Sequence, residues 1–100
     1  MTDDEAIEQE LKAKGLTAPR ITPEHIEELI IEAAYWQPEG TTLTVCALKL
    51  RNGTVVVGES ACVSPKNFDL ELGRKLARED ATRKIWPLEG YLLKESLAHD

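Results

Sequence analysis

A chain of 100 residues, 42% hydrophobic and 30% charged, has the composition of one small globular domain and is too short for a second core. Its charge is uneven, because residues 1–40 carry ten acidic and three basic side chains, whereas residues 41–100 carry eight acidic and nine basic ones. This balance excludes general nucleic-acid binding, which needs a broad positive surface, but is compatible with a small anion held by a few local cations.

The sequence also limits the compartment and the chemistry. It contains no apolar run near the roughly 18 residues of a spanning helix, and its acidic start lacks the pattern of a signal peptide. We therefore expect a cytoplasmic protein with reduced thiols at Cys46 and Cys62. The cysteines and the two histidines, His25 and His99, show no metal-binding spacing, so neither a metal nor a cofactor is expected.

The N-terminal part is expected to be helical. Residues 1–20 are predicted to hold an acidic helix that ends at Gly15 and is weakly anchored, because few of its side chains are apolar. Residues 21–100 are predicted to form a single domain. Its first helix should begin with Thr22 as the cap and should run on as far as Trp36.

The pair Asn52-Gly53 lies between two β-branched runs, which is a strong hairpin signal. A two-residue turn there would place Glu59 on the core side of the hairpin, unless a bulge at Gly58 turned it outward. The pairing predicted from this turn is Leu50 with Val55, Leu48 with Val57 and Cys46 with Glu59.

The pattern becomes helical again from about Asp69 to Trp86, and Pro87 should end or kink that helix and start another. The complete order is thus predicted as α-α-β-β-α-α. We expect the α+β class, with a small antiparallel hairpin or sheet packed against helices.

Arg74 and Arg78 are spaced i, i+4, so their side chains should leave one face of the helix predicted from about Asp69 to Trp86. Two arginine forks one turn apart can hold a phosphate or a pyrophosphate. The structural alternative is that they are solvated or paired with Glu71, Glu79 or Asp80 on the same helix.

Three residues before that helix are further binding candidates. Asn67 and Asp69 could cap backbone N–H groups or hydrogen-bond the hydroxyls of a ribose. Phe68 could stack on a base or simply pack at the helix start. Gly73 weakens the helix, which suggests that another backbone or a ligand comes close.

A catalytic function is not expected. Ser60, Cys62 and Ser64 lie near Glu59, but nothing in the sequence places a histidine beside them as a general base. We therefore interpret the chain as a non-enzymatic protein.

Several motifs resemble a family of small phage and prophage proteins, the gene-49/gene-66-like family. They are the "RNG" hairpin, "GESACVSP", "NFD", "GRKLARE" and "KIWPLEGYLL", which follow one another between about residues 43 and 97. This family is similar in turn to anti-Thoeris sponge proteins, oligomers that sequester cyclic ADP-ribose isomers without degrading them.

The resemblance implies an anti-defence protein in the host cytoplasm that self-associates and binds a nucleotide-derived messenger, a cyclic ADP-ribose isomer or a cyclic oligonucleotide. It implies that Arg74 and Arg78 grip the pyrophosphate, that Asn67 and Asp69 address ribose hydroxyls, and that Phe68 or a residue on the hairpin faces the adenine. The alternative is a small phage regulatory protein that binds a host protein through its acidic N-terminal region.

Overall fold

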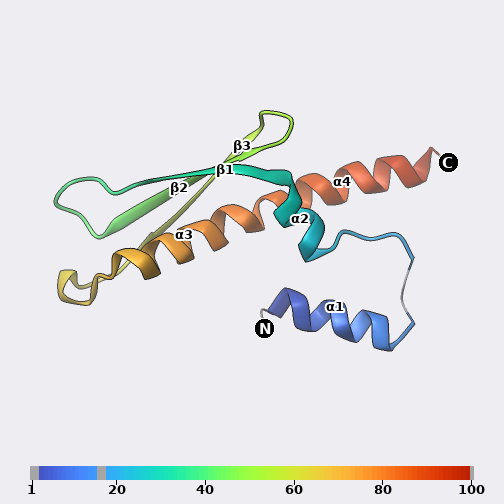
Figure 1. Ribbon diagram of the computed structural model, residues 1–100, viewed down its shortest axis with the longest axis horizontal. Helices are drawn as coiled ribbons and strands as arrows, with labels where there is room; N and C mark the ends of the chain where they lie inside the picture. Colours follow the sequence, from blue (N-terminus) through green and yellow to red (C-terminus); the bar gives the residue numbers. More distant parts are fainter. Residues whose placement is uncertain (1–2, 16–17, 100) are drawn as a thin grey trace.

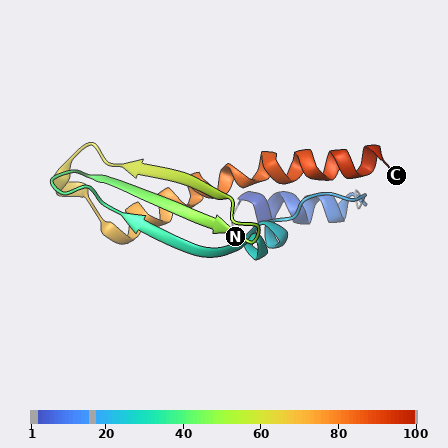
Figure 2. The ribbon, with the colours of Figure 1, turned by 90° about the horizontal axis from the view of Figure 1, so that it is seen from above.

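The computed structural model describes residues 3–15 and 18–99 and confirms the α+β class. Three antiparallel strands form one sheet in the order β1-β2-β3, and α3 lies beneath one face of it (Figure 1). Helix α4 continues from α3 beyond the end of the sheet (Figure 2), whereas α1 lies apart from α4, on the far side of α2 in Figure 1. The elements are α1 (Asp3–Ala13), α2 (Pro23–Leu29), β1 (Ile30–Trp36), β2 (Leu43–Leu50), β3 (Val55–Ala61), a 3-10 turn (Pro65–Asn67), α3 (Leu70–Arg83) and α4 (Ile85–Ala98).

The sheet contains a strand that the sequence analysis assigned to a helix. Thr22 caps α2 as expected, since its side chain accepts a hydrogen bond from the His25 N–H at 3.1 Å. The helix nevertheless ends at Leu29, and β1 follows it directly. Residues 30–36 are rich in β-branched and aromatic side chains, and pairing with β2 satisfies their backbone groups, which outweighs the helical spacing of their apolar residues.

The hairpin register also differs from the predicted one, by one residue. Leu48 pairs with Val56, and Cys46 pairs with Gly58. The cause is a three-residue loop, residues 51–53, in which only Gly53 has a positive φ of 90°. Because side chains alternate along a strand, this shift turns Glu59 to the exposed face without any bulge at Gly58.

Small residues bring α3 very close to the sheet. Ala77 and Ala81 are fully buried and face Gly58 of β3. A Cβ atom on Gly58 would overlap the Ala77 carbonyl oxygen and the Ala81 amide nitrogen, and it would lie 2.8 Å from the Ala81 Cα. A Cβ atom on Gly73 would lie 2.7 Å from the buried Thr44 hydroxyl of β2. We call this contact the glycine-alanine seam; it is formed by Gly58, Gly73, Ala77 and Ala81.

The break between α3 and α4 follows from Pro87. Proline lacks an N–H and clashes with the carbonyl four residues earlier, which belongs to Arg83, the last residue of α3. Pro87 itself lies in the first turn of α4, which begins at the buried Ile85. Among the helices of residues 3–15 and 18–99, none is long and apolar enough to cross a bilayer.

Gly58→Ala tests the seam. The new methyl group cannot be accommodated without moving α3 away from the sheet, so we expect a loss of about 3 kcal/mol or more in the free energy of unfolding. Gly90→Ala is the matched control, because no atom lies within 4 Å of the added Cβ and Gly90 is inside α4. It should gain about 0.5–1 kcal/mol. Urea denaturation measures both, and equal behaviour of the two variants would refute the seam.

Candidate functional site

The seam directs the two arginines of α3 toward the β1 side of the sheet. The Arg74 guanidinium carbon lies 5.4 Å from the centroid of the Tyr35 ring, a cation–π contact. The Arg78 guanidinium donates a hydrogen bond to the Glu27 carboxylate of α2 at 3.0 Å. Arg78 therefore pairs with an acid of another element rather than with the acids of α3 that the structural alternative proposed.

The surroundings of Arg78 keep it charged. Burial acts to lower its pKa, but the hydrogen bond to Glu27, together with Tyr35, outweighs burial and leaves the pKa raised. The same small cluster includes the fully buried Cys46, whose pKa burial raises although Tyr35 and Arg78 partly offset the effect. Arg78 is thus a permanent cation, while Cys46 is a protonated, inert thiol at neutral pH.

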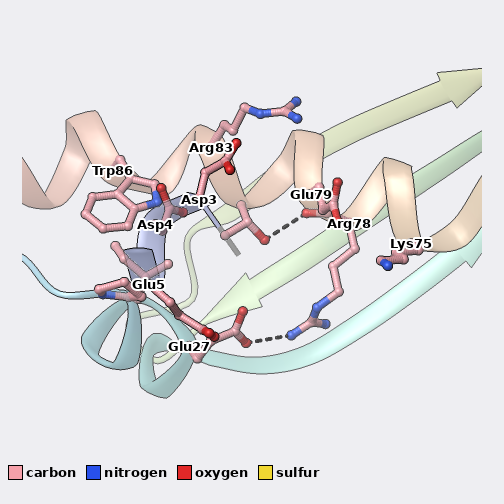
Figure 3. Close-up of a pocket in the computed structure, with 12 residues that line it drawn as sticks. Asp3, Asp4, Glu5, Glu27, Lys75, Arg78, Glu79, Arg83 and Trp86 are labelled. Carbon is pink, nitrogen blue, oxygen red and sulfur yellow. Dashed lines mark hydrogen bonds and ion pairs between the residues drawn. The ribbon is translucent and has the colours of Figure 1, made fainter. Parts of the chain in front are cut away.

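A cleft of about 790 Å³ opens beside Arg78, between α3 and the N-terminal helices. That volume lies within the usual range of small-molecule sites, about 300–1,000 Å³. In Figure 3, Lys75 and Arg78 project from α3 on one side of the cleft, while Trp86 lies at its other end. The lining residues are Asp3, Asp4, Glu5, Pro23, Ile26, Glu27, Lys75, Arg78, Glu79, Thr82, Arg83 and Trp86.

The cleft combines cations from one helix with acids from the others. Lys75, Arg78 and Arg83 all belong to α3, whereas Asp3, Asp4 and Glu5 form the first turn of α1. Figure 3 shows this acidic turn gathered between Trp86 and Glu27, facing α3. The cations are therefore opposed by carboxylates of the same chain.

The three candidates before α3 do not line this cleft. Asp69 caps α3 by accepting a hydrogen bond from the Leu72 N–H at 3.0 Å, and Asn67 is exposed. Phe68 is half-buried and lies beside Gly73. Nine positions separate Asp69 from Arg78, which is about 13 Å along a helix axis. Within one chain, these residues and Arg78 are not brought together.

Most of the cleft was not predicted from the sequence. Lys75, Thr82 and Trp86 recur with Arg78 at helical spacing across α3 and the start of α4, but this pattern resembles an ordinary solvated face. The acids of α1 had no such signal, because only the tertiary structure places residues 3–5 against residues 75–86.

The candidate nucleophiles lie elsewhere and have other partners. The Cys62 thiol donates to the Ser64 carbonyl oxygen at 3.2 Å. His25 contacts Glu89 of α4 at 3.4 Å and lines a separate groove. Inside the cleft, the Thr82 hydroxyl donates to the Arg78 carbonyl oxygen at 2.7 Å, within the helix.

Comparison with known proteins identifies the family. Residues 21–97 match the phage protein family described as N4 Gp49/phage Sf6 gene 66. Since this match covers more than half of the chain, the chain belongs to that family, which confirms the resemblance seen in its motifs. Neither the curated proteins nor the solved structures contain a match.

The two thiols should differ in reactivity. With Ellman's reagent the native protein should release one equivalent, from Cys62, because Cys46 is buried and its pKa is raised. Denatured protein should release two, and Cys62→Ser should abolish the native reaction. The contribution of protonated Cys46 to the free energy of unfolding is fully present below pH 9.0, the pKa of the unfolded thiol. It is lost as the pH rises through the higher pKa of the folded thiol. Rapid native labelling of Cys46 would contradict this assignment.

Proposed function

We propose that this phage-family protein binds a small nucleotide-derived anion in the cleft beside α3 and sequesters it without degrading it. The observation that supports this proposal most directly is Arg78, a permanent cation at the wall of a cleft of nucleotide size that Lys75 also lines. Its function would be anti-defence, exerted in the host cytoplasm against an immune second messenger.

A pyrophosphate fits the cations of the cleft. The planar guanidinium of Arg78 can donate two parallel hydrogen bonds to phosphate oxygens, and the Lys75 ammonium adds a mobile positive charge. Arg74 lies one helical turn before Arg78 and over the Tyr35 ring; it does not line the cleft itself, but it is a second guanidinium on the same side of α3. A cyclic ADP-ribose isomer or a cyclic oligonucleotide supplies phosphates of this kind.

The rest of the cleft offers groups for a nucleoside. The half-buried Trp86 ring can stack on a base, since such stacking tolerates any base. Carboxylates such as Glu27 can accept hydrogen bonds from ribose hydroxyls. Asn67, Phe68 and Asp69 lie outside the cleft of their own chain, so any part they play in binding would need a neighbouring copy that presents them to it.

Sequestration rather than turnover is supported by the groups lining the cleft. Among the residues that the structure describes, neither a cysteine, a serine nor a histidine lines it, and the Thr82 hydroxyl is engaged with its own helix. The cleft thus lacks the paired nucleophile and histidine base that acyl or phosphoryl transfer through a side chain commonly uses.

We also propose that the protein self-associates through the sheet face opposite α3. Trp36 is 64% exposed and Val55 is 55% exposed on this face, which no described element covers. The radius of gyration, 16.3 Å, exceeds the roughly 13 Å of a compact domain of this length. A second copy would bury the apolar face.

Ligand binding can be tested by a thermal-shift screen against cyclic ADP-ribose isomers and cyclic oligonucleotides. We expect one of these ligands to raise the melting temperature and to be recovered unchanged after the protein is heated. Arg78→Ala and Lys75→Ala should each weaken binding about tenfold or more, as expected for lost charge-assisted hydrogen bonds. Arg74→Ala tests whether the second fork contributes.

Lys66→Ala and Lys94→Ala are the controls, because both lysines are exposed and neither lines the cleft. Arg78→Ala should keep the fold within about 1 kcal/mol, since its ion pair with Glu27 is partly exposed. If no ligand of either class binds, sequestration is wrong, and loss of anti-defence activity on removal of residues 1–20 would favour the host-protein alternative. Turnover of the ligand would instead identify an enzyme.

Self-association predicts that Trp36→Ser lowers the oligomeric mass measured by sedimentation equilibrium. Tyr91→Ser is the matched control, because Tyr91 is equally exposed, at 68%, but belongs to α4. A wild-type monomer at high concentration, or equal effects of both changes, would contradict an interface on the sheet.

A further inference from the structure

The first turn of α1 brings carboxylates to the same cleft as the cations that the proposed ligand would need. Asp3 and Asp4 line the same cleft as Lys75 and Arg78, and Figure 3 shows them on the side that faces α3. A phosphate entering this space would meet two sets of negative charge, its own and that of α1. The two cannot occupy the space beside the same cations at low cost.

Little apolar contact holds α1 in place. Ile7, one of its few large apolar side chains, is 55% exposed, and the buried residue of this helix is the charged Glu8. Glu8 is held by Arg20, whose Nε donates to the carboxylate at 3.3 Å and whose terminal nitrogen forms an ion pair with it. The docking of α1 thus depends largely on this one charged contact, which is mostly shielded from solvent and is therefore screened less by salt than an exposed pair.

Displacement of α1 would not require the helix to unfold. Its acids lie in its own first turn, where they are stabilised by the helix dipole whether or not the helix is docked. Residues 14–15 and 18–22, which are described between α1 and α2, lie outside any helix or strand, so they do not hold α1 rigidly to α2.

We infer that the acidic first turn of α1 is an internal competitor for the anion site, which lowers its affinity for weakly charged ligands and admits those with a denser charge, such as a pyrophosphate. This inference rests on the proposed function. The apparent affinity is reduced by the fraction of molecules in which α1 is docked, so removing the acids raises it.

The mechanism has a signature in the salt dependence of binding. In the wild-type protein the ligand phosphates replace the α1 carboxylates beside the same cations. Salt screens both attractions, so the affinity for the ligand should change little with salt concentration. Without the acids, binding becomes a plain attraction between anion and cations, and it should respond more steeply. A change in net charge elsewhere on the surface would not alter the slope in this way.

The experiment compares full-length Asp3→Asn/Asp4→Asn with the wild type by calorimetry, using inorganic pyrophosphate and a cyclic ADP-ribose isomer as probes, at salt concentrations from about 0.05 to 0.5 M. Glu10→Gln/Glu28→Gln is the matched control, since it changes the net charge equally, and neither residue lines the cleft. Arg20→Gln is a third variant, which keeps Asp3 and Asp4 but removes the partner of Glu8.

We expect the Asp3→Asn/Asp4→Asn protein to bind about tenfold more tightly at low salt, with a steeper salt dependence, the control to match the wild type, and Arg20→Gln to lie between. Binding by the variant but not by the wild type would support the competitor in its strongest form. Equal affinities and slopes would overturn it while leaving the proposed function standing. If neither probe binds any variant, both fail.

Discussion

The contact between the backbone of α3 and Gly58 of β3 determines where every other side chain of α3 points. With Ala77 and Ala81 turned into the seam, Asp80 lies on the β3 side and accepts a hydrogen bond from the Glu59 N–H at 2.9 Å. This bond satisfies one backbone N–H of the edge strand β3, which could otherwise pair with a strand of another chain. Arg78 lies on the other side, toward Tyr35 and Glu27, and so reaches the cleft.

The acids of the N-terminal elements and the cations of α3, which are far apart in the sequence, line one cleft in the structure. The cations of the cleft all belong to α3, while most of its acids come from the first forty residues, in α1 and α2. Of these acids, Glu27 pairs with Arg78 at 3.0 Å through a partly exposed contact that salt weakens, whereas Lys75 and Arg83 remain exposed to solvent. Such contacts are suited to a surface that exchanges one anion for another, unlike the seam, which has no alternative packing.

The sequence was sufficient for the features that depend on local chemistry. The sequence predicted Thr22 as a cap, Asp69 as either a cap or a ribose ligand, Asn52-Gly53 as a hairpin turn and Pro87 as a helix break. Each of these features rests on hydrogen bonds or sterics within a few residues. The errors arose where distant contacts decide. Strand β1 forms because β2 pairs with it, and the register shifted because the loop adopted three residues rather than two.

By itself the sequence determined the α+β class, the family and an arginine pair on one helical face, because motif order and helical spacing require no knowledge of tertiary contacts. Only the tertiary structure decided what those arginines face. The glycine-alanine seam sets the rotation of α3, which places Arg74 over Tyr35 and Arg78 at the cleft and leaves Asn67 to Asp69 outside it. The tertiary structure also brought the acids of α1 to the same cleft as Lys75 and Arg78, because charges far apart in sequence share a site only when the fold brings them together.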